Sequence, residues 1–208
     1  MVTQSIVLVV CGGMHDPQIT DSIIALIKAD EWLTQLALKQ FPSASRLAVL
    51  SGASLRSCMD GHWTGESKAR LIIWAFSAGC IGAAALANYW QRYRGEVLAL
   101  FMVDGWGVPW SQAAPLHRLS HDAFTHISSN YLGEGVVNFV ASPAVDHRQL
   151  WQAPQRVTGQ QIMTRHLSLS RRWIHHLNGF QPSPSTTAAD FLCTWSRYHL
   201  VRAVGDSC

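Results

Sequence analysis

Residues 71–87 read LIIWAFSAGCIGAAALA and contain no charged side chain. The length of this run approaches that of a membrane-spanning helix. The β-branched and aromatic residues Ile72, Ile73 and Trp74 come first, however, then Ser77-Ala78-Gly79 interrupts the run, and mostly small residues follow. The stretch therefore predicts a buried strand over 71–76, a sharp turn and a helix over 78–93 in a soluble protein.

Apolar runs and helical patterns alternate on both sides of this stretch. Residues 6–11 are apolar and end at Gly12-Gly13, as is typical of a strand buried on both faces. Residues 19–41 place apolar side chains at three- and four-residue spacing and predict a helix. Further elements are expected as strands at 47–50, 97–103 and 136–141 and as a last helix from Thr186-Thr187. Strands separated by helices imply parallel crossovers, so the predicted fold class is α/β with a doubly wound, mostly parallel sheet.

The whole chain, 1–208, is expected to form a single domain, since 208 residues suffice for one core. Residues 105–135 interrupt the alternation and are expected to form a small cap or loop excursion above the sheet. The aromatic side chains of this excursion either roof a pocket and face an acyl chain or aromatic group, or complete a core. They are Trp106, Trp110, Phe124 and Tyr131.

The composition excludes several classes of protein. With 48% hydrophobic and 14% charged residues, the chain is not a disordered protein, an acidic tail or a coiled coil. The net charge of +3 comes with no basic run, so nucleic acid is not an expected partner. The five cysteines are scattered and form no Cys-x-x-Cys pair, which favours a reducing, cytoplasmic location. The first apolar run lacks the preceding positive residues of a signal peptide.

The segment Ala75-Phe76-Ser77-Ala78-Gly79 places small residues two positions before and after a serine, at a strand-to-helix junction. A nucleophile elbow needs this pattern, because bulky side chains there collide with the neighbouring strand and helix. The alternative is a tight turn with an N-capping serine. In this elbow and in its element order, the chain up to about Trp151 resembles the α/β-hydrolase superfamily. The strings 104–109 and 117–126 also resemble a little-characterised group of hydrolase-like cyanobacterial proteins, which implies no substrate.

The resemblance implies a serine hydrolase in which Ser77 attacks a carboxylic ester or thioester. It places the oxyanion hole at the backbone N–H groups of Ala78 and of the Gly12-Gly13 turn. Asp104 and Asp146 both follow predicted strands after the elbow helix, and Asp146 has the family's usual location for the acid, so it is preferred. The implied partner is a small-molecule acyl substrate, and no cofactor is implied.

The histidine is the point where the chain departs from the family. In the family, the catalytic histidine lies in the loop before the last helix. The corresponding loop here, residues 181–185, contains no histidine. We expect His175, which lies upstream of that helix, to be the catalytic histidine, and His176 and His166 are the alternatives. His147 is adjacent to Asp146 and so badly placed to pair with it. Because a serine without an imidazole is a poor nucleophile, a non-catalytic hydrolase-like binding or scaffold protein is the alternative.

Residues 117–126 hold a second polar cluster. On a helix, the i,i+4 pairs His117/His121 and Asp122/His126 would each share a face and could bind a metal. The spacing fixes no acidic or thiolate third ligand, so no metal site is assigned. A metal-dependent enzyme that uses His117, His121 and His126 is a third hypothesis.

Overall fold

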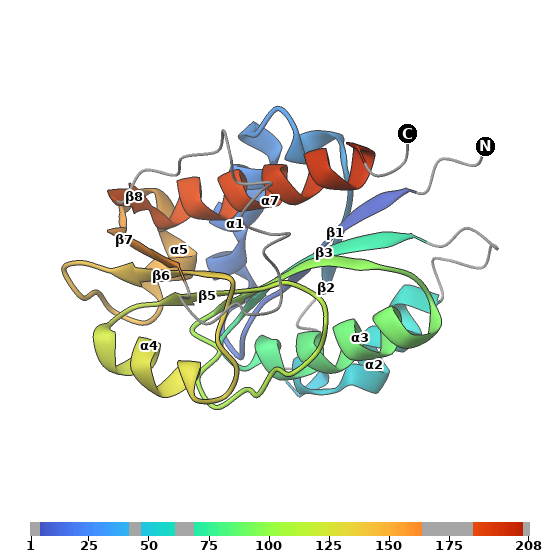
Figure 1. The fold of residues 1–208 in the computed structure, drawn as a ribbon, viewed down its shortest axis with the longest axis horizontal. Coiled ribbons are helices and arrows are strands. Elements are labelled where there is room, and N and C mark those ends of the chain that lie inside the picture. The colour runs from blue at the N-terminus through green and yellow to red at the C-terminus, as the bar shows by residue number, and fades with distance from the viewer. Residues whose placement is uncertain (1–4, 42–46, 61–68, 164–184, 206–208) are drawn as a thin grey trace.

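The computed structural model describes residues 5–41, 47–60, 69–163 and 185–205. They form one eight-stranded sheet in the order β2-β1-β3-β4-β5-β6-β7-β8 (Figure 1). Neighbouring strands from β2 to β6 pair in parallel, and β7 and β8 pair antiparallel. The strands are β1 Ile6–Cys11, β2 Ala37–Phe41, β3 Arg70–Phe76, β4 Val97–Val103, β5 Leu116–Ser120, β6 Val137–Ala141, β7 Thr158–Met163 and β8 Ser185–Thr187.

Helices cover both faces of this sheet (Figure 1). One face carries α1 Asp21–Ala29, α5 Gln149–Gln152 and α7 Ala188–Gly205, and the other carries α2 Gly52–Asp60, α3 Gly79–Tyr93 and α4 Ala123–Asn130. Alternate residues of the central strands enter two separate cores. In β3, Ile72 and Trp74 pack on the side of α7, while Ile73 and Ala75 pack on the side of α3. Burial on both faces explains the low charge of the central strands.

The predicted α/β class with a mostly parallel sheet is confirmed. The strands expected at 6–11, 71–76, 97–103 and 136–141 agree with β1, β3, β4 and β6 to within a residue. The helix expected over 78–93 is α3. None of the helices in the described ranges is long and apolar enough to cross a membrane.

The prediction for residues 19–50 was wrong in two places. Helix α1 ends at Ala29, and the Asp30 carboxylate accepts the N–H groups of Trp32 and Leu33 at 3.0 Å each, which turns the chain. The strand β2 then lies within the expected helix, at the edge of the sheet, where exposed polar residues hide the strand pattern. The expected strand at 47–50 is instead a 3₁₀ turn over Ala48–Leu50 that leads into α2.

The expected excursion over 105–135 also differs from the structure, because its middle is the sheet strand β5 between β4 and β6. All five residues of β5 are buried, including His117 and Arg118. The Arg118 guanidinium donates to the carbonyl groups of Gly133 at 2.7 Å and Val108 at 2.9 Å. These polar side chains break the apolar run by which the other internal strands are recognised, but hydrogen bonds make their burial tolerable.

Candidate active site

Ser77 occupies a tight turn between β3 and α3. Its φ of 52° lies in the left-handed region, a strained conformation for a residue with a side chain that is maintained by the surrounding packing. A Cβ on Gly79 would lie 2.3 Å from the Gly12 carbonyl oxygen, and one on Gly13 would lie 3.1 Å from the Ser77 Cβ. Glycine at these positions therefore allows the end of β1 and the start of α3 to approach the serine closely.

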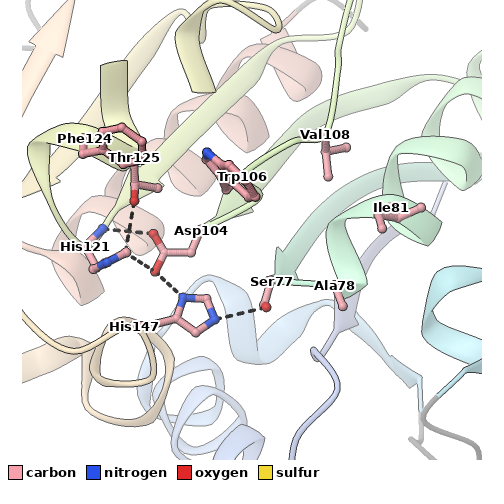
Figure 2. A pocket seen from close by; sticks show the side chains of 10 residues that line it. All are labelled: Ser77, Ala78, Ile81, Asp104, Trp106, Val108, His121, Phe124, Thr125 and His147. Carbon is pink, nitrogen blue, oxygen red and sulfur yellow. Dashed lines mark hydrogen bonds and ion pairs between the residues drawn. The ribbon is translucent and has the colours of Figure 1, made fainter. Parts of the chain in front are cut away.

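The side chains of Ser77, His147 and Asp104 form a hydrogen-bonded chain (Figure 2). His147 Nε2 lies 3.1 Å from Ser77 Oγ, and His147 Nδ1 lies 2.8 Å from Asp104 Oδ2. Because a carboxylate only accepts, Nδ1 carries the imidazole proton and Nε2 is free to accept the serine hydroxyl. The Phe76 ring stacks on the His147 ring, with centroids 4.8 Å apart, and holds its plane.

The three side chains come from the same edge of the sheet. Ser77 follows β3, Asp104 follows β4 and His147 lies beyond β6. Parallel strands direct their carboxyl ends to one edge, where ligand sites of open α/β sheets lie. Asp104 is 4% exposed and has a φ of 51°, and its Oδ1 accepts the His121 N–H at 3.0 Å. The carboxylate is thus held in place from the backbone as well as through His147.

Asp146, the preferred acid of the sequence prediction, lies apart from the serine. Its exposed carboxylate accepts the Arg148 N–H at 2.9 Å and its carbonyl accepts the Gln149 N–H, so it organises the start of α5. The structure brings Ser77 together with Asp104 instead. His175, His176 and His166 lie outside the described residues.

His147 was set aside because it is adjacent to Asp146. Adjacency disfavours pairing with Asp146 alone, and the structure pairs His147 with Asp104, which is 43 residues earlier in the chain. A signal was present in the sequence, because a histidine in the loop after a strand reaches the same edge of the sheet as an acid that ends an earlier strand.

Two of the expected oxyanion donors lie beside the serine, at the first turn of α3 and at the end of β1. The Ala78 N–H makes no hydrogen bond within the described ranges and stands at the positive end of the α3 dipole. The Gly13 N–H donates to His15 Nε2 at 3.0 Å, while His15 Nδ1 faces the Asp16 carbonyl oxygen at 2.8 Å. One of these donors is therefore open, and the other is covered by a side chain.

A cavity of about 310 Å³ opens above Ser77 (Figure 2). Apart from the hydrogen-bonded side chains of Ser77, His147 and Asp104, the walls of the cavity are mostly apolar. Ile81 and Val108 lie on one side, and Trp106 and Phe124 lie on the other. A second cavity, of about 460 Å³, shares Ile81 and Val108 with the first and includes Trp110. Of the four aromatic residues expected to roof a pocket, Tyr131 lines neither of these cavities and is 87% exposed.

The histidines of residues 117–126 do not lie on one helix. His117 is in β5 and faces His199 inside the core on the α7 side, whereas His121 follows the strand and lines the cavity. Asp122 caps α4 by accepting the Thr125 N–H at 2.7 Å, and His126 lies further along that helix. The i,i+4 spacing on which the predicted metal pairs depended therefore does not bring His117 near His121, since a strand separates them.

The chain matches no protein-family model, and no curated protein matches it either. The chemistry open to the site follows from its geometry. A hydroxyl group lies within hydrogen-bond reach of an imidazole that a buried carboxylate orients, beside backbone N–H groups and an apolar cavity. These are the parts that acyl transfer through a serine requires.

Proposed function

We propose that the protein is a serine hydrolase of the α/β-hydrolase type that cleaves a carboxylic ester or thioester. The observation that carries the proposal is the chain from Ser77 through His147 to Asp104, with its contacts of 3.1 and 2.8 Å. The order nucleophile, acid, histidine along the sequence is that of the family. The non-catalytic alternative depended on a missing imidazole, and His147 removes that reason for it.

In the proposed reaction, Ser77 Oγ attacks the carbonyl carbon while His147 Nε2 takes its proton. Asp104 stabilises the imidazolium, whose Nε2–H then protonates the departing alcohol or thiol. Water attacks the acyl-serine with His147 again as the base, which releases the carboxylic acid and restores the hydroxyl of Ser77. The complete cycle consumes the ester or thioester and one water, returns the enzyme to its starting state and needs no cofactor.

The negative oxygen of each tetrahedral intermediate needs donors that are already in place. Ala78 supplies one N–H from the first turn of α3. Gly13 supplies the second once the substrate oxygen replaces His15 Nε2 as its acceptor. The cost of that exchange is small, because one hydrogen bond to the same N–H replaces another.

The cavity favours a substrate with an apolar group next to the scissile bond. Trp106 is 64% and Phe124 is 70% exposed, although burial of such side chains is favourable. Both line the cavity that contains Ser77. An acyl chain or aromatic group bound there would cover them and leave the reacting carbonyl at the serine.

Labelling with a fluorophosphonate tests the proposal. We expect a single adduct on Ser77, located by mass spectrometry of peptides, and its loss in Ser77→Ala and His147→Gln. Ser128→Ala, which changes a half-buried serine of α4, is the matched control and should label like the unaltered chain. Folded protein that stays unlabelled at millimolar probe contradicts the proposal.

A further inference from the structure

His121 is a second imidazole on the carboxylate of Asp104. Its Nδ1 lies 3.0 Å from Asp104 Oδ2, the same oxygen that His147 Nδ1 approaches at 2.8 Å (Figure 2). The hydrolytic mechanism uses one of these imidazoles and assigns no role to the other. One carboxylate oxygen and two ring nitrogens thus converge beside the cavity.

These atoms are suitable ligands for a transition-metal ion. Zinc binds imidazole nitrogen and carboxylate oxygen, often with three protein ligands and one open position, whereas Mg²⁺ and Ca²⁺ prefer oxygen alone. The three atoms lie within 4.8 Å of one another. Tetrahedral zinc with bonds of about 2.0–2.1 Å separates its ligand atoms by about 3.3 Å, so the two short contacts need to open by only a few tenths of an ångström.

The surroundings of the cluster also fit a metal site. Side-chain exposure of 24% for His121 and 41% for His147 leaves a route for an ion from the cavity, while Asp104 is buried beneath. His121 Nε2 lies 3.5 Å from Asp122 Oδ2, so a carboxylate stands behind the outer nitrogen of this imidazole. Carboxylates in that position orient metal-binding histidines and raise their basicity.

We propose that Asp104, His121 and His147 bind a zinc-like transition-metal ion, and that this ion switches off the hydrolase. The inhibitory part depends on the proposed function, but the binding part does not. Binding to His147 Nδ1 requires the lone pair there, so the proton of the neutral ring moves from Nδ1 to Nε2. The Nε2–H then faces Ser77 Oγ as a donor and cannot take the proton of the serine.

Calorimetry on untagged, metal-free protein tests the binding part. We expect one Zn²⁺ per chain at this cluster, no heat from Mg²⁺, and binding weakened by about 10- to 100-fold or more in His121→Gln. His126→Gln, a nearby histidine outside the cluster, should bind zinc as the unaltered chain does. Equal zinc affinity in His121→Gln and the unaltered chain would overturn the proposal.

Labelling of Ser77 by fluorophosphonate tests the inhibitory part. The labelling rate should fall at the zinc concentrations that saturate the calorimetric site and should return when a chelator is added. An unchanged or faster rate in the zinc-saturated protein overturns inhibition. If the metal-free protein is not labelled at all, the hydrolase proposal fails, and calorimetry still decides the metal site.

Discussion

Lowering the pH should destabilise the protein through a pair of histidines in the core. His117 in β5 and His199 in α7 are buried, with their Nε2 atoms 2.9 Å apart, and His117 Nδ1 lies 3.0 Å from the Val137 carbonyl oxygen. Since a carbonyl only accepts, Nδ1 of His117 carries its proton and its Nε2 accepts from His199. Burial lowers the pKa of His117 to about 4. Burial, with His117 and Arg202 nearby, lowers the pKa of His199 well below its usual value.

The sign of the effect follows from these directions. A histidine whose pKa is lower in the folded chain binds protons more readily when the chain is unfolded. The contribution of His117 to the stability of the protein is therefore fully present above pH 6.5 and is lost as the pH falls toward 4. Each tenfold change in proton affinity is worth about 1.4 kcal/mol. His117 alone should therefore cost roughly 2 kcal/mol by pH 5 and about 3 kcal/mol by pH 4. This loss is large, because the whole free energy of unfolding of a native protein is only about 5–15 kcal/mol.

Urea unfolding at pH 7, 6 and 5 measures this loss in a range above the titration of ordinary carboxylates. The double variant His117→Gln/His199→Gln replaces both rings by amides that can bond to each other, and its stability should change much less over the same range. Histidine ring NMR supplies a check that needs no variant, because His117 should remain neutral down to pH 5. Titration of the His117 ring near pH 6.5, or an equal loss of stability in the double variant and the unaltered chain, would contradict a role of this pair in the acid sensitivity.

Three further predictions concern the site and the loop beside it. Arg118→Met removes the donor from two loop carbonyls now bonded at 2.7 and 2.9 Å, and should cost on the order of 3 kcal/mol in urea unfolding; a loss below about 1 kcal/mol contradicts it. His15→Ala frees the Gly13 N–H for the substrate oxygen and should raise kcat/KM for an aryl ester about fivefold, which corresponds to the free energy of one hydrogen bond. A fall in kcat/KM would mean instead that His15 positions the turn. Phe124→Ala should lower kcat/KM for octanoyl esters several-fold more than for acetyl esters, and an equal effect on both would remove Phe124 from substrate binding.

The readable part of the fold consists of strands that are buried on both faces. β1, β4 and residues 71–76 of β3 are continuous apolar runs, because neither face meets water. β5 does not show this pattern, since His117 and Arg118 lie in its middle and form hydrogen bonds with residues outside the strand. β2 escapes it for the opposite reason, as an edge strand with polar, partly exposed residues.

The parts of the candidate site that depend on neighbouring residues could be predicted from the sequence. The parts that depend on the order of strands in the sheet could not. The small residues around Ser77 indicate the turn, because they allow it to pack closely against its sequence neighbours and the adjoining strand. The partner of His147 depends on β5 lying between β4 and β6, and that strand was not recognised in the sequence. Without it, the distance between Asp104 and His147 has no basis in spacing, and adjacency to Asp146 was a misleading guide.

The most direct test of a catalytic relay, in which Asp104 orients His147 and His147 takes the proton of Ser77, is the hydrolysis rate of an aryl ester in Asp104→Asn and Asp146→Asn. We expect Asp104→Asn to lower kcat on the order of 10³- to 10⁴-fold, because an amide NH₂ facing Nδ1 favours the wrong tautomer of His147. Asp146→Asn should stay within about threefold of the unaltered chain, since it changes an exposed cap away from the serine. A large loss in Asp146→Asn with little change in Asp104→Asn would contradict the relay.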